Sequence, residues 1–282
     1  MIQGRSQEML DNLLSLFVWL TAIFFSLLFL LLLGEIVQHG WEKLSWSFLT
    51  QSPESAGRSG GINSVLFSTF WILLICLGTC VPLGLGTAIF LAEFVSPYSR
   101  IGTLIRFSLD LLASVPSIVF GLFGNAFFGV YLGMGFSLVS GGLTLACMSL
   151  PLFARTVEAS LRLIPQSYRL SASALGLTRT ETLLYLLLPL ALPGIFAGFV
   201  LSVGRSLSET AALIFTSGYV LRTPESIWDS GRSLSVHIYD LSMNVPGGES
   251  SAYATALVLI FLLLLIHLCF SWGLKYFKES AY

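Results

Sequence analysis

Long stretches without a single charged side chain dominate this sequence. The run from Leu13 to Leu33 has 21 uncharged residues, the run from Ile62 to Ala92 has 31, and 44 uncharged residues separate Asp110 from Arg155. A helix needs roughly 20 apolar residues to cross the hydrocarbon of a bilayer. Hydrophobic residues make up 55% of the chain and charged residues 10%, which is outside the range of soluble domains. The sequence therefore predicts an all-α, polytopic membrane protein.

The uncharged stretches have room for six transmembrane helices. The 44-residue run can hold two of them, with a tight turn near residues 131–136, and the first run is too long for the core of a signal peptide. The predicted spans cover about residues 13–37, 62–93, 103–130, 137–157, 183–216 and 250–275. Because the connections are short, residues 1–282 are expected to form a single transmembrane domain.

Basic residues predict the orientation, since loops rich in Lys and Arg tend to stay in the cytoplasm. Nine of them fall on one set of span ends, namely Arg5, Arg100, Arg106, Arg155, Arg162, Arg169, Arg179, Lys275 and Lys278. Four fall on the other set, namely Lys43, Arg58, Arg222 and Arg232. Both termini are therefore predicted to be cytoplasmic.

Several functional classes are disfavoured by composition. The net charge of −1 argues against a nucleic-acid partner, and the four cysteines lie in apolar runs without the spacing of a zinc site or a disulfide framework. None of the three lysines follows a glycine, so the phosphate-binding Gly-Lys-Ser/Thr loop of an ATPase is absent. We expect no enzyme activity, metal or cofactor in this chain, and any ATP hydrolysis to belong to a partner.

One cytoplasmic loop, residues 163–189, is polar enough to contact a soluble partner. Pro165 is typical of a helix start and Gly176 of a helix end, and residues 178–181 are suited to cap a second helix that runs to Pro189. A simple surface hairpin is one interpretation. A pair of short helices presented to a soluble partner is the other.

The loop resembles the cytoplasmic signature of permease subunits of ABC importers, which reads Glu-Ala-Ala, three residues, Gly, nine residues, Ile-x-Leu-Pro. Gly176, Leu188 and Pro189 match it, Leu186 replaces the isoleucine, and Leu170-Ser171-Ala172 replaces the first triplet, so the glutamate is missing. The resemblance implies that the loop couples the permease to an ATPase. The residues that it assigns to this contact are Arg169, Ser171, Ala172, Gly176 and Pro189.

Further segments are similar to the permeases of phosphate importers, the PstA type: residues 106–110, 114–123, 151–156 and 204–216. This resemblance implies the six-helix core of type I importers. It also implies a sister permease (PstC-like), an ATP-binding subunit dimer (PstB-like) and an external phosphate-binding protein (PstS-like), besides membrane lipid. Molybdate or tungstate is the alternative substrate, and a stand-alone channel or secondary transporter the alternative function.

Arg205 stands near the middle of the fifth predicted span, where an unpaired charge is expensive. Glu209 follows at i+4, which would place both side chains on one face of a continuous helix. A structural ion pair is one interpretation. In the other, the planar guanidinium binds a tetrahedral oxyanion during its passage, and Glu209 competes with the anion for Arg205.

The third predicted span adds polar groups to the candidate pathway. Pro116 interrupts its apolar run between Ser114 and Ser117, and Asn125 follows two turns later. A helix that restarts at Pro116 would direct free N–H groups toward an anion, whereas an ordinary proline kink is equally compatible with the sequence. Asp110 is expected to pair with Arg106, one turn before it on the same helix.

Overall fold

Five long helices carry most of the apolar stretches of this chain. The computed structural model describes the backbone of residues 2–96 and 98–280, with side chains described from residue 11 to residue 273 within those ranges. The long helices are α1 (Ile2–Trp41), α3 (Asn63–Ile89), α6 (Leu138–Leu163), α9 (Leu188–Leu207) and α12 (Glu249–Ser280). Each contains a segment long and apolar enough to cross a membrane. In four cases the bounds of this segment differ from those of the helix, because it includes a neighbouring turn or leaves out one end of the helix. The predicted all-α fold is confirmed.

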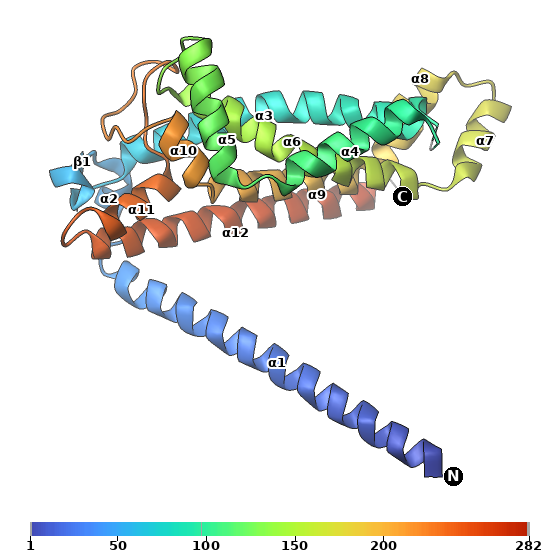
Figure 1. Cartoon of the computed structure of the whole chain (residues 1–282), viewed down its shortest axis with the longest axis horizontal. Helices are drawn as coiled ribbons and strands as arrows, with labels where there is room; N and C mark the ends of the chain where they lie inside the picture. Colours follow the sequence, from blue (N-terminus) through green and yellow to red (C-terminus); the bar gives the residue numbers. More distant parts are fainter. Residues whose placement is uncertain (1, 97, 281–282) are drawn as a thin grey trace.

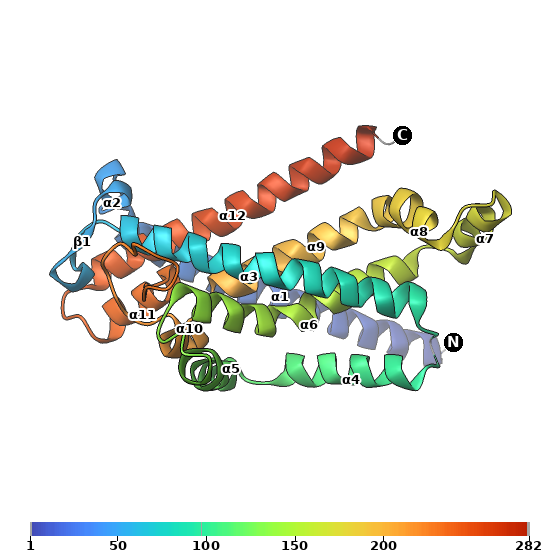
Figure 2. The same cartoon turned by 90° about the horizontal axis from the view of Figure 1, so that it is seen from above.

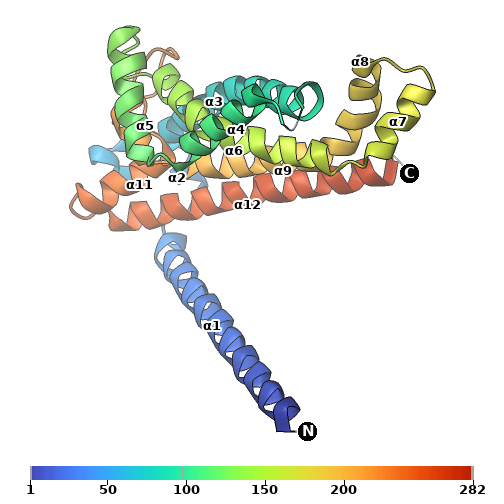
Figure 3. The same cartoon turned by 45° about the vertical axis from the view of Figure 1, so that its right-hand side comes forward.

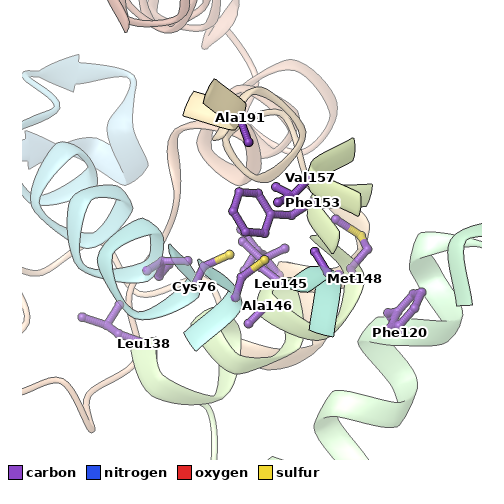
Figure 4. Packing of buried hydrophobic residues seen from close by; sticks show 14 of the residues in the cluster. Cys76, Phe120, Leu138, Leu145, Ala146, Met148, Phe153, Val157 and Ala191 are labelled. Atoms are coloured by element: carbon purple, nitrogen blue, oxygen red, sulfur yellow. The ribbon is translucent and has the colours of Figure 1, made fainter. Parts of the chain in front are cut away.

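Helix α6 forms the centre of the bundle and packs between α3 and α9. Phe153 of α6 is fully buried, and a Cβ atom added to Gly84 of α3 would lie 2.6 Å from its ring. A Cβ atom on Gly198 of α9 would lie 3.2 Å from the same ring. Figure 4 shows Phe153 in the core with Ala191 of α9 and Cys76 of α3. The glycines thus let three helices close around one aromatic ring.

Helix α1 leaves the bundle and extends away from it (Figures 1 and 3). The apolar side chains of its membrane-length segment are exposed, and residues near its C-terminal end, such as His39, contact α12. Gly40 makes this contact possible, because a Cβ atom there would lie 2.7 Å from the carbonyl oxygen of Tyr253. The apolar surface of α1 is therefore available to lipid or to another subunit.

The segment predicted as one span over residues 103–130 is two helices and a π-helical turn. Helix α4 (Arg100–Ser114) and helix α5 (Ser117–Gly124) are bent by 100° at the break around Pro116, and η3 (Asn125–Tyr131) continues α5. Proline lacks the N–H that would continue the helix, and it disfavours helical geometry at Val115, which is extended with ψ of 130°. Of the two alternatives that the sequence left open at Pro116, the structure has the restarted helix, so the segment predicted as the third span is broken there.

The fifth predicted span, residues 183–216, also ends earlier than expected. It begins with the π-helical turn η4 (Thr182–Leu187), and α9 stops at Leu207. A separate short helix, α10 (Ala211–Thr216), follows the break. Ser208 bonds the carbonyl oxygens of Gly204 and Arg205 with its side chain, at 2.9 and 3.1 Å, which competes with continuation of the helix.

The connections at one end of the bundle form a folded cap. It contains α2 (Trp46–Thr50), α11 (Leu234–Met243) and the antiparallel strands β1 (Pro53–Glu54) and β2 (Ser59–Gly60), joined by the 3₁₀ turn η1 (Ser55–Gly57). Pro53 pairs with Gly60, and Glu54 pairs with Ser59. Arg232 anchors the loop before α11 through an ion pair with Asp240, with 2.7 Å between Nη1 and Oδ2.

The opposite end of the bundle carries the two short helices of the polar loop. Helix α7 (Gln166–Ala174) and helix α8 (Arg179–Glu181) lie beyond the ends of α3, α6 and α9, far from α2 and β1 (Figures 1 and 2). Helix α7 begins directly after Pro165, as the sequence predicts. Gly176 follows it with a φ of +77°, the left-handed geometry that suits glycine at a helix end.

Candidate functional site

Arg205 lies in the last turn of α9 with its side chain half-buried. Its Nε atom is shielded from solvent and has no hydrogen-bond partner among the described residues. Arg205 also forms no ion pair with any of the described residues. The surface of α9 at the neighbouring Gly204 is not covered by other side chains, since no atom would lie within 4 Å of a Cβ added to Gly204. A desolvated donor without an acceptor is costly, so this guanidinium is suited to bind a group from outside the chain.

Glu209 does not form the expected pair with Arg205. The sequence argument assumed a continuous helix, but α9 ends at Leu207, so the two side chains no longer share a helical face. Glu209 instead accepts a hydrogen bond at Oε1 from the backbone N–H of Ala212, at 3.3 Å, in the first turn of α10. A carboxylate is favourable at this helix start. In the described part of the structure, the ion pair between Arg205 and Glu209 that helical spacing suggests is therefore not formed.

Two polar residues of the bent segment, Ser114 and Ser117, flank the break between α4 and α5, and Asn125 lies at the other end of α5. Ser114 is exposed and donates its hydroxyl to the carbonyl oxygen of Leu111 at 2.7 Å, while Ser117 and Asn125 are half-buried. Hydrogen bonds from these three side chains to Arg205 or Glu209 are not found in the described part of the chain. Helix α5 nevertheless packs on α10, the helix that follows Arg205 in the sequence. The two helices meet at Gly121, where a Cβ atom would lie 2.8 Å from the Cα of Ala212.

The coupling loop, residues 163–189, has a defined local structure. Thr178 and Glu181 form a capping box: the N–H of Glu181 donates to Thr178 Oγ1 at 3.3 Å, and the N–H of Thr178 donates to Glu181 Oε2 at 2.8 Å. Of the residues assigned to ATPase contact, Ser171, Gly176 and Pro189 are exposed, whereas Ala172 is buried and Arg169 is mostly buried. The loop also exposes large apolar side chains. These are Leu163, Tyr168, Leu170, Leu175, Leu177, Leu184 and Tyr185.

A cluster of arginines surrounds Glu158 of α6, close to the coupling loop. Its carboxylate is 3% exposed and pairs with Arg106 at 2.7 Å, Arg155 at 3.1 Å and Arg162 at 3.0 Å. Asp110 pairs with Arg155, with 3.1 Å between Oδ1 and Nε, and not with Arg106 as predicted. Arg106 reaches Glu158 because α4 packs on α6, which brings a more buried carboxylate within its reach. The cluster thus fastens α4 to α6.

Replacing Glu158 by glutamine should lower the free energy of unfolding by about 3 kcal/mol, because three arginines would lose their shared carboxylate. Thermal and denaturant unfolding of the purified protein in detergent measures this change. The matched control is Asp110→Asn, because the Asp110 side chain is 56% exposed and such a pair contributes about 1 kcal/mol or less. Equal losses for the two variants would contradict the central role of Glu158.

Comparison with known proteins identifies the family. Residues 81–280 match the model of the binding-protein-dependent transport system inner membrane component. The chain belongs to this family. The matched region contains the coupling loop, Arg205 and every helix from α4 to α12, so the candidate site lies entirely within it.

Two curated relatives are similar to this chain over most of their length. The chain is 32% identical to a probable ABC transporter permease protein, YqgI, of Bacillus subtilis, over 88% of this chain and 90% of the relative. It is 34% identical to phosphate transport system permease protein PstA 2 of Mycobacterium bovis, over 78% of this chain and 73% of that protein. An inward-facing structure of the MetNI methionine ABC transporter matches with a TM-score of 0.59 at 19% identity, over 77% of this chain and 94% of that one. This last likeness shows the fold alone.

Family membership confirms the main features predicted from the sequence. The chain is a permease subunit of an ABC importer, a multi-pass component of the inner membrane, and it resembles the PstA type. It is a transport subunit and not an enzyme, since the ATPase of such a system is a separate chain. The family name also implies a substrate-binding protein as a partner.

Two charged residues near the coupling loop escaped the sequence analysis. Glu93 and Glu158 each pair with an arginine that is distant in sequence, Arg169 for Glu93 and Arg106 for Glu158. One signal was present for Glu158, because Arg155 and Arg162 flank it at i−3 and i+4. For Glu93, whose partner Arg169 is 76 residues away, local sequence carries no comparable signal.

Proposed function

We propose that this permease moves inorganic phosphate into the cytoplasm by alternating access. The main support for an anionic substrate is Arg205. Its side chain is half-buried, and its Nε has no hydrogen-bond acceptor within the described chain. Relatives named as phosphate transport system permeases support phosphate as this anion; the PstA of Mycobacterium leprae, for example, is 32% identical over 84% of this chain. Guanidinium suits the task because its planar donors match two phosphate oxygens and its charge is permanent.

In this proposal Arg205 contacts the anion during passage, and Glu209 is its alternate partner. Glu209 is four residues away and uses its carboxylate to cap α10 at a distance of 3.3 Å, a weak bond that is easily exchanged. A change in the break at residues 208–210 would let the carboxylate replace phosphate and release it. Ser114, Ser117 and Asn125 supply further polar contacts along the route, beside the restarted helix α5.

The coupling loop transmits ATP binding and hydrolysis to the spans. Its exposed residues Ser171, Gly176 and Pro189 form the surface offered to the ATPase, together with the apolar side chains around them. Ala172 and Arg169 hold α7 to the permease, since both are largely buried within this chain. A mixed apolar and polar patch of this kind is suited to a tight protein contact.

The assembly requires a sister permease of the PstC type, two PstB-like ATPase subunits and an external PstS-like binding protein. In this proposal both termini lie in the cytoplasm. The orientation is supported by the described ends of α1 and α12, which lie toward the same end of the molecule as α7 and α8 (Figures 1 and 2). The cap with α2 and α11 then faces the external binding protein.

Uptake of radiolabelled phosphate into proteoliposomes tests the substrate. The complete complex, with ATP on the cytoplasmic side and the binding protein on the other, should accumulate phosphate, and tenfold excesses of molybdate or tungstate should not compete. The control omits the binding protein. Accumulation of molybdate or tungstate in place of phosphate would overturn the phosphate assignment while leaving the importer function intact.

A further inference from the structure

Arg169 of the coupling helix α7 is joined to the end of the second span. Its Nε donates to Oε2 of Glu93 at 3.1 Å, and its Nη2 donates to Oε1 at 2.5 Å. Glu93 belongs to η2 (Phe90–Phe94), the π-helical turn that ends α3. The two side chains are 19% and 15% exposed, so this two-point contact is largely shielded from water.

The same guanidinium caps α6. Arg169 Nη1 donates to the carbonyl oxygen of Ile164 at 2.9 Å, and Nη2 donates to that of Leu161 at 3.0 Å. These carbonyls belong to the C-terminal end of α6, where no later helical N–H is available. One side chain of α7 therefore holds two different spans, α3 and α6.

Helix α7 has few other attachments to the bundle. Ala172 is its only buried residue in the described structure. Its remaining apolar side chains, such as Leu170, point to solvent or to a partner, with Leu170 63% exposed. Because apolar packing is so limited, a displacement of α7 passes to the spans through the backbone at the ends of α7 and, among its side chains, chiefly through Arg169 and Ala172.

The η2 turn is in turn fixed to the arginine cluster around Glu158. The carbonyl oxygen of Leu91 accepts from Arg106 Nη2 at 3.1 Å and from Arg162 Nη2 at 3.0 Å. These arginines also pair with Glu158, so η2, α4 and α6 form one connected polar unit. A force applied to Glu93 thus reaches three helices.

The Glu93–Arg169 pair lines an open cavity of about 330 Å³ between α7 and η4. Arg179 and Thr182 are on its wall as well. The pair therefore lies beside the surface that the proposed function assigns to the ATPase, and closure of this cavity would press directly on it.

We propose that Glu93 and Arg169 are a positioning pair that transmits movement of the coupling helix to α3 and α6. This inference rests on the proposed docking of the loop on an ATPase. The loop triplet Leu170-Ser171-Ala172 has no carboxylate, and Glu93 supplies one to α7 from the adjacent span. Neither residue touches the substrate or ATP in this role.

Glu93→Gln tests the pair most cleanly, because it removes the charge and leaves Arg169 free to cap α6. The assembled complex is reconstituted with its ATPase and loaded binding protein, and ATP hydrolysis and phosphate uptake are measured together. We expect the ATP consumed per phosphate transported to rise at least tenfold at an unchanged yield of assembled complex, with a lower thermal stability because a shielded two-point pair is lost. Glu93→Asp, which keeps the charge, should restore most of the coupling.

The matched control is Asp110→Asn, which removes an exposed carboxylate that pairs with Arg155 and lies outside the coupling loop. Its ratio of ATP to phosphate should stay within twofold of the wild type. A normal ratio in Glu93→Gln, while Gly176→Pro still uncouples the complex, would overturn this inference alone. Normal coupling in both Glu93→Gln and Gly176→Pro would instead overturn the docking of the loop. Loss of assembly in both Glu93→Gln and Glu93→Asp would make the pair merely structural and would also overturn the inference.

Discussion

Phosphate uptake is expected to stop when Arg205 is replaced by alanine. The substitution removes the fixed positive charge from the end of α9, and phosphate would then cross a poorly solvated barrier without a counter-charge. Arg205→Lys keeps the charge but loses the planar pair of donors, so uptake should fall about tenfold, the cost of one charge-assisted hydrogen bond of roughly 1.5 kcal/mol. The measurement is the initial rate of uptake into proteoliposomes, normalised to intact complex.

Arg222→Ala provides the matched control for this substitution. Arg222 follows α10 in the sequence, and its side chain is 65% exposed. Among the described residues it forms one ion pair, with 3.9 Å between its Nη2 and Oδ2 of Asp229. Its removal should leave uptake within about twofold of the wild type, since exposed pairs contribute little. Near-normal uptake in Arg205→Ala would show that the guanidinium has only a structural role.

Gly176→Pro is expected to uncouple the transporter. Gly176 has a φ of +77° and its N–H donates to the carbonyl oxygen of Ser173 at 3.1 Å. Proline is fixed near −65° and has no N–H, so the turn between α7 and α8 must change. Stimulation of ATP hydrolysis by the loaded binding protein and phosphate uptake should both fall more than tenfold, while the protein remains in the membrane.

The control for this turn is Gly176→Asn. Asparagine tolerates left-handed geometry, and no atom lies within 4 Å of the Cβ position, so the side chain has room. Uptake and ATP hydrolysis should therefore stay close to wild-type values. If assembled Gly176→Pro complexes transport normally, residues 163–189 are not the docking site for the ATPase.

Local chemistry in the sequence was sufficient to predict much of this protein. The uncharged runs predicted the long helices, because their length alone matches a bilayer. In the coupling loop, Pro165 and Gly176 predicted the bounds of α7, and Thr178 with Glu181 predicted the capped start of α8. Each of these signals acts within one or two helical turns, so it can be read without knowledge of the fold.

Only the tertiary structure decided which charges meet. Glu209 was expected beside Arg205 by helical spacing, but α9 ends between them, and Asp110 pairs with Arg155 across two helices instead of with Arg106 on its own. Glu93 meets Arg169, 76 residues later in the chain. The reason is physical: helical periodicity fixes neighbours only within one continuous helix, whereas ion pairs between helices depend on where each helix ends and on which face its neighbour packs.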